Sequence, residues 1–376
     1  MRIAVLKETK AFEKRVALTP DVVKSLVKKG FDVCIEKGAG DNSNFSDQQF
    51  IDAGSSIGKN TKDTCQADVI LKVNSFTMEE VSLCADASVC ISFMYAYTIP
   101  EVLEVMKKKN ISSFSMDAVP RISRAQKMDA LSSQANLAGY KTVLLGANAL
   151  GKIFPLMMTA AGTITPSKVL IFGAGVAGLQ AIATAKRLGA VVEVTDVRPE
   201  TKEQVESLGG RFLSVEGAEA VTVEGGYAKE VSAEFLQKQK TLIQEKIKDA
   251  DIVITTALVI GKKAPLLVTE EMVKSMKTGS VIVDMAVESG GNCELAEMNK
   301  TVVKHGVTII GESNLPSLLP VNASQLYATN ISTLLLHLAD KDAFKWEMEE
   351  EITKGSLITH KGEIVHEFTK KVLGIV

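Results

Sequence analysis

The sequence feature that most constrains the fold is the run Gly173-Ala174-Gly175-Val176-Ala177-Gly178. A short apolar run, 169–172, precedes it and a helical pattern, 179–188, follows it. In a strand, glycine turn and helix of this kind, the glycines permit a tight turn, close backbone approach to a pyrophosphate and close packing of helix on strand. The run therefore predicts a parallel α/β sheet with a dinucleotide site at the amino end of the helix, where free N–H groups favour anions. A glycine turn without a ligand is the alternative.

The end of the next predicted strand indicates which dinucleotide fits. Asp196 stands there, and a carboxylate in this position accepts hydrogen bonds from the adenosine ribose and repels a 2′-phosphate. Arg198 argues the other way, because a nearby arginine can accommodate that phosphate. We give the acid more weight, since charge repulsion in a partly buried site is costly, and predict NAD(H) over NADP(H).

Two later strand ends are candidates for the nicotinamide side. Ala257 and Leu258 follow one predicted strand, and 284–288 ends the next. The carboxyl ends of parallel strands are where the crevice of such a sheet opens. Simple packing of small residues is the competing interpretation.

Length and pattern predict two domains, because 376 residues exceed one ordinary core. Short β-rich runs alternate with amphipathic helical patterns, which is typical of βαβ units. The expected strands are 2–6, 32–36, 68–73, 88–93, 112–116, 168–172, 191–197, 251–256, 280–286 and 307–310. A helix over 128–147 should connect the domains, and a helix over 323–338 and a hairpin over 356–365 should pack back on the first. The predicted fold class is α/β, with two Rossmann-like parallel-sheet domains separated by a nucleotide-binding cleft; the first spans 1–135 plus about 320–376 and the second, the Rossmann NAD(H)-binding domain, 136–319.

Composition narrows the remaining classes. The formal net charge of -2 provides no basic surplus for nucleic acid. The most apolar stretch, 169–185, is shorter than the roughly 20 apolar residues that a bilayer needs, so we expect no membrane insertion. The five cysteines form no CxxC pair and no signal-peptide pattern is visible, so we expect a reduced, intracellular setting. We predict no metal site.

Several motifs resemble the superfamily of alanine dehydrogenases and proton-translocating nicotinamide nucleotide transhydrogenases. Motifs resembling both branches are 7–8, 13–20, Lys72, 158–163 and 284–291. Three stretches resemble only the transhydrogenase branch: 120–134, with its Arg-Gln-Asp loop; the insert at about 213–248, with 224–230 as its mobile loop; and 201–210. The chain looks like the NAD(H)-binding component of a transhydrogenase, in the form where the alpha subunit is split.

The resemblance implies roles for individual residues. Residues around the nicotinamide, its ribose and the pyrophosphate would be Arg121, Gln126, Lys127, Met128, Asp129 and Ser132. Residues at the pyrophosphate and adenosine would be Gly173, Ala174, Gly175, Val176, Gly178, Asp196, Val197 and Arg198. Gly226 and Tyr227 would close over the cofactor, and the catalytic group would comprise Arg121, Gln126, Asp129 and Tyr227. The alternatives are that Arg121 and Asp129 only cap or pair with the connecting helix and that Tyr227 lies on an idle surface loop.

The mechanism follows from the histidines, all of which lie late in the chain: His305, His337, His360 and His366. An amino-acid dehydrogenase usually needs an acid–base group beside its carbonyl carbon, and Tyr95 stands where the dehydrogenase branch has its histidine. Direct hydride transfer between two nicotinamides needs no such group. An NAD-dependent alanine dehydrogenase, using Arg15 and Lys72, and a non-catalytic NAD-binding module remain alternatives.

The resemblance also implies partners. NADP(H) would lie on a separate component, and a membrane-spanning component would anchor the complex. The chain itself would be a homodimer, peripheral to the cytoplasmic face of the membrane, and active in Re/Si-specific transhydrogenation only with these partners.

Overall fold

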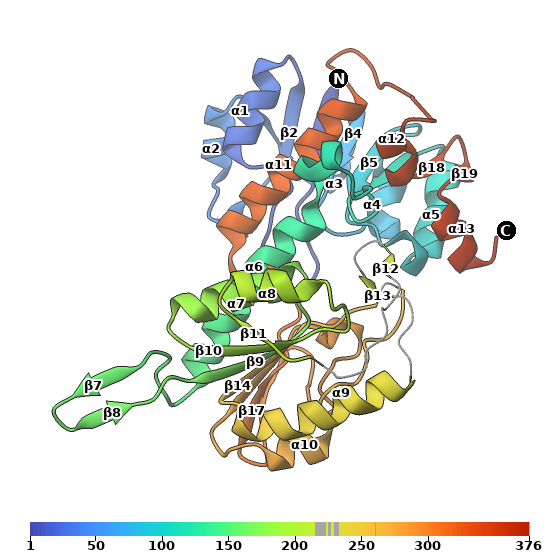
Figure 1. Cartoon of the computed structure of the whole chain (residues 1–376). Helices are drawn as coiled ribbons and strands as arrows, with labels where there is room; N and C mark the ends of the chain where they lie inside the picture. The colour runs from blue at the N-terminus through green and yellow to red at the C-terminus, as the bar shows by residue number, and fades with distance from the viewer. Residues whose placement is uncertain (215–222, 225–226, 229–232, 260, 376) are drawn as a thin grey trace. The chain divides into compact units, whose positions relative to one another are not determined.

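The chain forms two compact units, each built on one mainly parallel sheet (Figure 1). The computed structural model describes residues 1–214, 223–224, 227–228, 233–259 and 261–375. Met1–Gln134 and Ser317–Val376 make up the first unit, and Ala135–Pro316 the second. The predicted α/β class with two Rossmann-like sheets is confirmed.

The first unit contains an eight-stranded sheet in the order β19-β18-β6-β5-β4-β1-β2-β3. The run from β3 to β6 is parallel, and β18 and β19 add an antiparallel edge. Its strands are β1 (Arg2–Val5), β2 (Asp32–Glu36), β3 (Ser56–Gly58), β4 (Val69–Leu71), β5 (Val89–Ser92), β6 (Ser112–Ser115), β18 (Leu357–His360) and β19 (Glu363–Ile364). Its α-helices are α1 (Pro20–Lys28), α2 (Asp47–Asp52), α3 (Thr61–Thr64), α4 (Met78–Leu83), α5 (Pro100–Lys108), α11 (Pro320–Leu338), α12 (Glu351–Ser356) and α13 (Glu367–Leu373).

Both faces of this sheet are buried. Along β1, Ile3 and Val5 join one hydrophobic cluster, while Ala4 joins another, as the two-residue period of a strand requires. The carboxyl-terminal helix α11 contributes Tyr327 and Leu335, both fully buried, to the first of these clusters. The carboxyl-terminal segment is thus part of the core of the first unit.

The second unit contains a seven-stranded sheet in the order β11-β10-β9-β14-β15-β17-β16, in which β16 is the antiparallel strand. Its strands are β9 (Lys168–Phe172), β10 (Val191–Thr195), β11 (Arg211–Phe212), β14 (Ile252–Thr255), β15 (Val281–Asp284), β16 (Thr301–Lys304) and β17 (Val307–Ile310). Two short hairpins stand outside it, β7 (Met157–Thr159) with β8 (Gly162–Ile164) and β12 (Val223–Glu224) with β13 (Tyr227–Ala228). Its α-helices are α7 (Val176–Arg187), α8 (Thr201–Ser207), α9 (Ala233–Lys246) and α10 (Glu270–Ser275), while α6 (Ala130–Ala149) begins in the first unit.

All the strands that the sequence predicts are present, some shorter by a residue or more at an end. The strands β3, β11 and β16 and the hairpins β7–β8 and β12–β13 were not predicted from the sequence. Among the described residues, we find no helix with both the length and the apolar character to cross a bilayer.

Candidate functional site

The glycine run forms the turn between β9 and α7, as its spacing predicts. Gly173 has φ +104°, a left-handed conformation that suits glycine, and its N–H donates to the carbonyl oxygen of Thr195 at 2.9 Å. A Cβ on Gly178 would collide with the carbonyl oxygen of Gly173, so the first turn of α7 lies directly against the end of β9. Among the described residues, a Cβ on Gly175 would have only the Arg198 guanidinium nearby, at 4.0 Å. The backbone at Gly175 is therefore open to a close ligand.

Asp196 follows β10 and ties this turn to the next strand end. Its Oδ2 accepts a hydrogen bond from the Ala174 N–H at 2.6 Å, and its Oδ1 accepts one from the Arg198 N–H at 2.8 Å. The Arg198 side chain also donates from Nε to Oδ1 and from Nη2 to Oδ2, both at 2.9 Å. The sequence argument for repulsion of a 2′-phosphate left out this pairing, which neutralises much of the Asp196 charge.

Thr256 connects the end of β14 to the glycine turn. Its hydroxyl donates to the Phe172 carbonyl oxygen at 3.0 Å, and its N–H donates to the same oxygen at 2.9 Å. The next residues are Ala257, partly buried, and Leu258, 44% exposed. The structure thus brings the predicted residues Gly173, Asp196 and Ala257 to one edge of the sheet, with Asp196 bonded to the turn.

The strand order explains why a dinucleotide suits this edge. Counting from β9, the six parallel strands follow the order 3-2-1-4-5-6, so the direction of winding reverses between β9 and β14. Ligands of such sheets bind outside the carboxyl ends of the strands at this reversal, with the pyrophosphate at the helix amino terminus. The open backbone at Gly175 and the acceptor Asp196 fit NAD(H): the first would approach the pyrophosphate, and the second would meet the adenosine ribose.

The predicted Arg-Gln-Asp loop forms a 3-10 helix, η3 (Ser123–Met128), in the first unit. Gln126 and Lys127 are exposed, as is Arg121 just before η3. Met128 is only 5% exposed and packs in the core, which leaves its backbone for a ligand. Asp129 accepts hydrogen bonds from the Ser132 N–H at 2.9 Å and the Ser132 hydroxyl at 2.6 Å, so both residues also cap α6.

Asn330 on α11 holds this loop. Its Nδ2 donates to the Lys127 carbonyl oxygen at 2.9 Å, and its Oδ1 accepts from the Ser133 hydroxyl at 2.7 Å. Of the predicted lid residues, Tyr227 lies in β13, whereas Gly226 lies outside the described residues. The role of the segment as a lid therefore stays a prediction.

Arg15 and Lys72, shared with the dehydrogenase branch, are buried in a network of ion pairs. Arg15 donates to both carboxylate oxygens of Glu13, at 2.8 and 2.7 Å, and to Gln134 Oε1 at 2.9 Å. Burial opposes ionisation of Glu13, but the Arg15 charge and its hydrogen bonds hold the pKa of Glu13 well below the ordinary range. Lys72 Nζ lies 2.6 Å from Glu80 and 3.9 Å from Glu8. Both cations are already partnered.

Other polar residues that act on neighbouring backbone were not predicted from the sequence. Buried carboxylates at strand ends accept several N–H groups each: Glu8 from Val73 and Asn74, Asp117 from Met94 and Tyr95, and Asp284 from Ala286, Asn292 and Cys293. Burial raises the pKa of Glu8 and of Asp117. Their position directly after a strand was the available signal.

The comparisons agree with this geometry. The family description "Alanine dehydrogenase/PNT, N-terminal domain" matches residues 4–138, and "Alanine dehydrogenase/PNT, C-terminal domain" matches 142–367. The chain is 50% identical to the first of the separate chains that make up the NAD(P) transhydrogenase alpha subunit of Rhodospirillum rubrum, over 97% of this chain and 98% of that one.

Two solved structures are also similar. A transhydrogenase from Sinorhizobium meliloti has a TM-score of 0.85 and 43% identity, over 98% of this chain and 100% of that one. An L-alanine dehydrogenase has a TM-score of 0.84 and 28% identity, over 100% and 99%. The chain therefore belongs to the alanine dehydrogenase/PNT family, and the resemblance of its motifs to transhydrogenase alpha subunits is confirmed.

Proposed function

We propose that this chain is the NAD(H)-binding component of a proton-translocating transhydrogenase. Hydride would pass between NADH on this chain and NADP+ on a partner component. The observation that carries the proposal is the edge of the second unit's sheet, where the glycine turn and Asp196 are joined by the 2.6 Å hydrogen bond at Ala174. The 50% identity to a transhydrogenase alpha chain supports this branch of the family.

The residues of the site would bind and orient the cofactor. The turn at Gly173–Gly178 would receive the pyrophosphate, because α7 presents its amino end there. Asp196, with Val197 and Arg198, would hold the adenosine, and Ala257 and Leu258 would border the nicotinamide half. By family resemblance, Arg121, Gln126 and Asp129 would place the nicotinamide. When bound, NAD(H) supplies the hydride, so the protein needs to align it and exclude water rather than move a proton.

The environment of Arg15 and Lys72 disfavours an alanine dehydrogenase. A substrate carboxylate would have to displace Glu13 and Gln134 from Arg15, or Glu80 from Lys72, in sites where the two cations are 7% and 2% exposed. Breaking a buried ion pair costs about 3–5 kcal/mol. Tyr95, at the position of the dehydrogenase histidine, has φ +44° and is 42% exposed. It is a poor general base at neutral pH, because the ordinary pKa of tyrosine is about 10.

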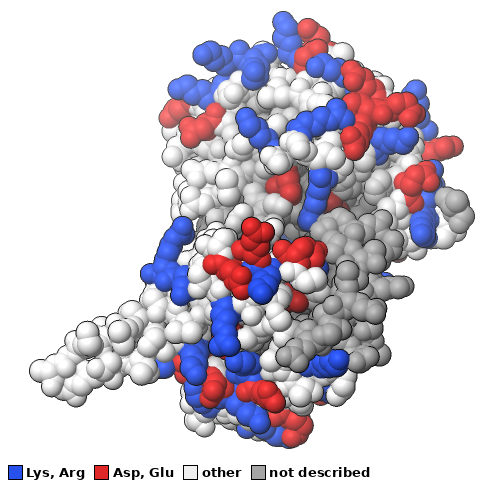
Figure 2. All heavy atoms as spheres, in the orientation of Figure 1, with Lys and Arg blue, Asp and Glu red and all other residues white. Residues whose placement is uncertain are grey.

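The hairpin β7–β8 supports the homodimer that we propose. Residues 155–165 are all exposed, including Met158 at 76%, and this segment contains no charged residue. Figure 1 shows the hairpin extending away from the sheet, and Figure 2 shows it as an uncharged projection. An isolated two-stranded hairpin is at best marginally stable in water, and exposed apolar surface of this kind marks an interface.

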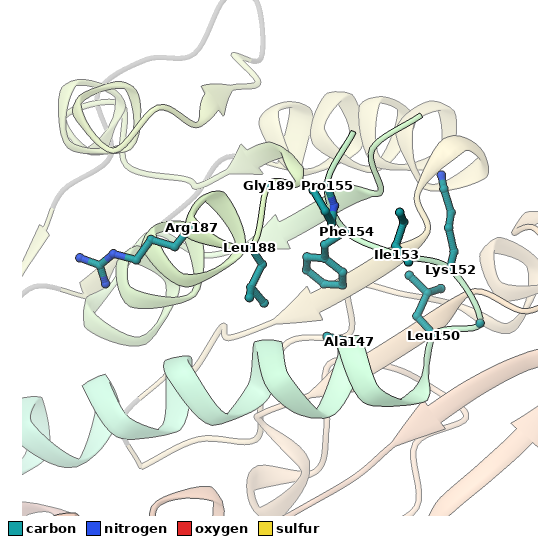
Figure 3. A pocket seen from close by; sticks show the side chains of 10 residues that line it. Ala147, Leu150, Lys152, Ile153, Phe154, Pro155, Arg187, Leu188 and Gly189 are labelled. Carbon is teal, nitrogen blue, oxygen red and sulfur yellow. The ribbon is translucent and has the colours of Figure 1, made fainter. Parts of the chain in front are cut away.

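A hollow of about 790 Å³ in the same unit offers a complementary surface. It is lined mostly by apolar groups from the end of α6, the loop before β9 and the end of α7, including Leu150, Phe154 and Leu188 (Figure 3). These segments precede β9 and β10, so the hollow is at the opposite sheet edge from the nucleotide site. We propose that a second copy covers the hairpin and this hollow, since a two-fold dimer uses the same surface on both copies.

The decisive experiment adds components one at a time. Alone, the chain should bind NADH, ahead of NADPH, and show no transhydrogenation. Reduction of an NADP+ analogue by NADH should begin when the NADP(H)-binding component is added, and proton translocation should require the membrane-spanning component as well. NADH oxidation by this chain alone with pyruvate and ammonium would instead establish the dehydrogenase.

Gln126 and Asp129 provide a test of the loop. Gln126→Ala and Asp129→Asn should each slow hydride transfer in the reconstituted system by at least about tenfold, which corresponds to about 1.4 kcal/mol. NADH affinity should change much less, because the adenosine and pyrophosphate contacts are untouched. The matched control is Arg124→Ala, which removes an exposed side chain of the same loop that pairs with Glu350 and Glu351. Unchanged turnover in both test variants would return the loop to a capping role.

A further inference from the structure

Asn292 is a buried side chain that bonds the backbone of two neighbouring segments. It lies after β15, is fully buried, and its Oδ1 accepts a hydrogen bond from the Ala257 N–H at 3.1 Å. Its Nδ2 donates to the Ala257 carbonyl oxygen at 3.0 Å and to the Pro265 carbonyl oxygen at 2.7 Å. Both amide protons of the side chain are therefore used, and both polar groups of the Ala257 backbone are bonded to one side chain.

The Asn292 backbone is itself fixed. Its N–H donates to Asp284 Oδ2 at 2.8 Å, and its carbonyl oxygen accepts from the N–H groups of Leu267 and Val268 at 2.8 and 2.9 Å. Asp284, fully buried, also accepts from the Thr255 hydroxyl at 3.1 Å. The end of β14 and the loop after β15 are thus tied together at two points, through Thr255 with Asp284 and through Ala257 with Asn292.

Ala257 is held by this asparagine, while its neighbour Thr256 is bonded to β9 through Phe172. The segment Thr256–Ala257 consequently spans from the turn at the adenosine half of the site to the loop beside the other half. In a sheet of this strand order, the second half of a dinucleotide lies at the carboxyl ends of the strands that follow the reversal, here β14 and β15.

We infer that Asn292 is a positioning residue that fixes the Ala257 backbone where the nicotinamide half of NAD(H) binds. The inference rests on the proposed function, because it takes NAD(H) to be the ligand. Asn292 acts through Ala257 and does not itself touch the cofactor. Loss of its two donated hydrogen bonds should loosen the floor under the nicotinamide and leave the adenosine and pyrophosphate contacts unchanged.

The test compares NADH with ADP-ribose, which lacks the nicotinamide, on the full chain by isothermal titration. Asn292→Asp keeps the size and the acceptor but loses both donors. We expect NADH affinity to fall about tenfold, as for one or two hydrogen bonds, while ADP-ribose affinity stays within about twofold. At saturating protein, the fluorescence anisotropy of the bound dihydronicotinamide should also be lower than in the wild type.

Ser167→Ala is the matched control for a general loss of stability. Ser167 is fully buried in the same unit, and its hydroxyl donates to the Ile153 carbonyl oxygen at 2.7 Å, before β9 rather than after β14. It should leave the NADH to ADP-ribose ratio and the anisotropy unchanged. If Asn292→Asp does not fold, Asn292→Ser, which retains one donor, should show a smaller shift in the same direction.

The outcomes separate the two claims. Equal weakening of NADH and ADP-ribose, or wild-type ratio and anisotropy in a folded Asn292 variant, would overturn the positioning role while NADH binding by the wild type stands. Failure of the wild-type chain to bind NADH would overturn the proposed function itself.

Discussion

Asp196 accepts four hydrogen bonds, one from the Ala174 N–H and three from Arg198. A ribose hydroxyl approaching this carboxylate would therefore compete with the guanidinium. Arg198 would be released only when the ribose bonds replace its own, so the two residues should act as a coupled pair in choosing between a 2′-hydroxyl and a 2′-phosphate.

Substitutions at this pair should change cofactor preference in opposite directions. Asp196→Ala should weaken NADH by about tenfold or more, because a charged hydrogen-bond acceptor contributes about 1.5–3 kcal/mol. It should also narrow the gap to NADPH, since Arg198 becomes available to a phosphate. Arg198→Ala should widen the gap. Titration of both variants with NADH and NADPH provides the check, and equal NADH and NADPH affinities in the wild type would refute the assignment.

At this scale the sequence predicts positions better than contacts. Asp196 could be placed by its spacing from the glycine run, because strand and helix lengths in a βαβ unit vary little. Its bidentate pairing with Arg198 depends on side-chain rotamers that spacing does not specify. Asn292 was missed for the same reason: its partners, Ala257 and Pro265, are distant in sequence and become neighbours only when β14 and β15 pair.

Among the helices, α12 depends on one carboxylate at its amino end. Glu350 accepts a hydrogen bond from the Thr353 N–H at 2.8 Å and lies 3.1 Å from His337 Nε2. Burial opposes ionisation, but these hydrogen bonds lower the pKa of Glu350 to about 2 from an ordinary value of 4.5. Because the pKa is lower in the folded state, this stabilisation is complete above about pH 4.5 and is lost as the pH falls toward 2.

Glu350→Ala should therefore destabilise the protein by about 1 kcal/mol near neutral pH, the usual effect of removing a helix cap. The difference from the wild type should shrink as the pH falls below about 4.5, where the wild-type carboxylate becomes protonated. Urea unfolding at several pH values measures both effects. Glu349→Ala is the control, since this neighbour is 89% exposed and pairs across the surface with Lys354. A pH-independent difference would show that the ionised form is not what stabilises α12.

Element prediction succeeded where burial creates a pattern. The strands β2, β9 and β17 have the bounds that the sequence predicts, because each is a mostly apolar run in a sheet covered on both faces. The hairpin β7–β8 has no such pattern: all its residues are exposed, so neither face selects apolar side chains. The turn of the terminal hairpin was predictable from Lys361-Gly362, which adopt φ +48° and +81°.

For the whole molecule, the hairpin gives the homodimer a direct test. Met158→Asp should weaken dimerisation by about a hundredfold, because the variant would bury a carboxylate without a partner in an apolar interface. Sedimentation velocity at a concentration where the wild type is dimeric should then show monomer. Met298→Asp is the matched control, since Met298 is a 56% exposed methionine of the same unit outside the hairpin and the hollow. A wild-type chain that sediments as a monomer would contradict the dimer.

The discontinuous first unit has a consequence for synthesis on the ribosome. Once residue 316 has emerged, the second unit is complete, while the first still lacks α11, β18 and β19. Without α11, the first unit lacks Tyr327, Ile331 and Leu335, all fully buried in its core. Domains generally fold as units during translation. The middle of the chain should therefore fold before its beginning, and the earliest strands should wait, exposed to chaperones, for the last residues to arrive.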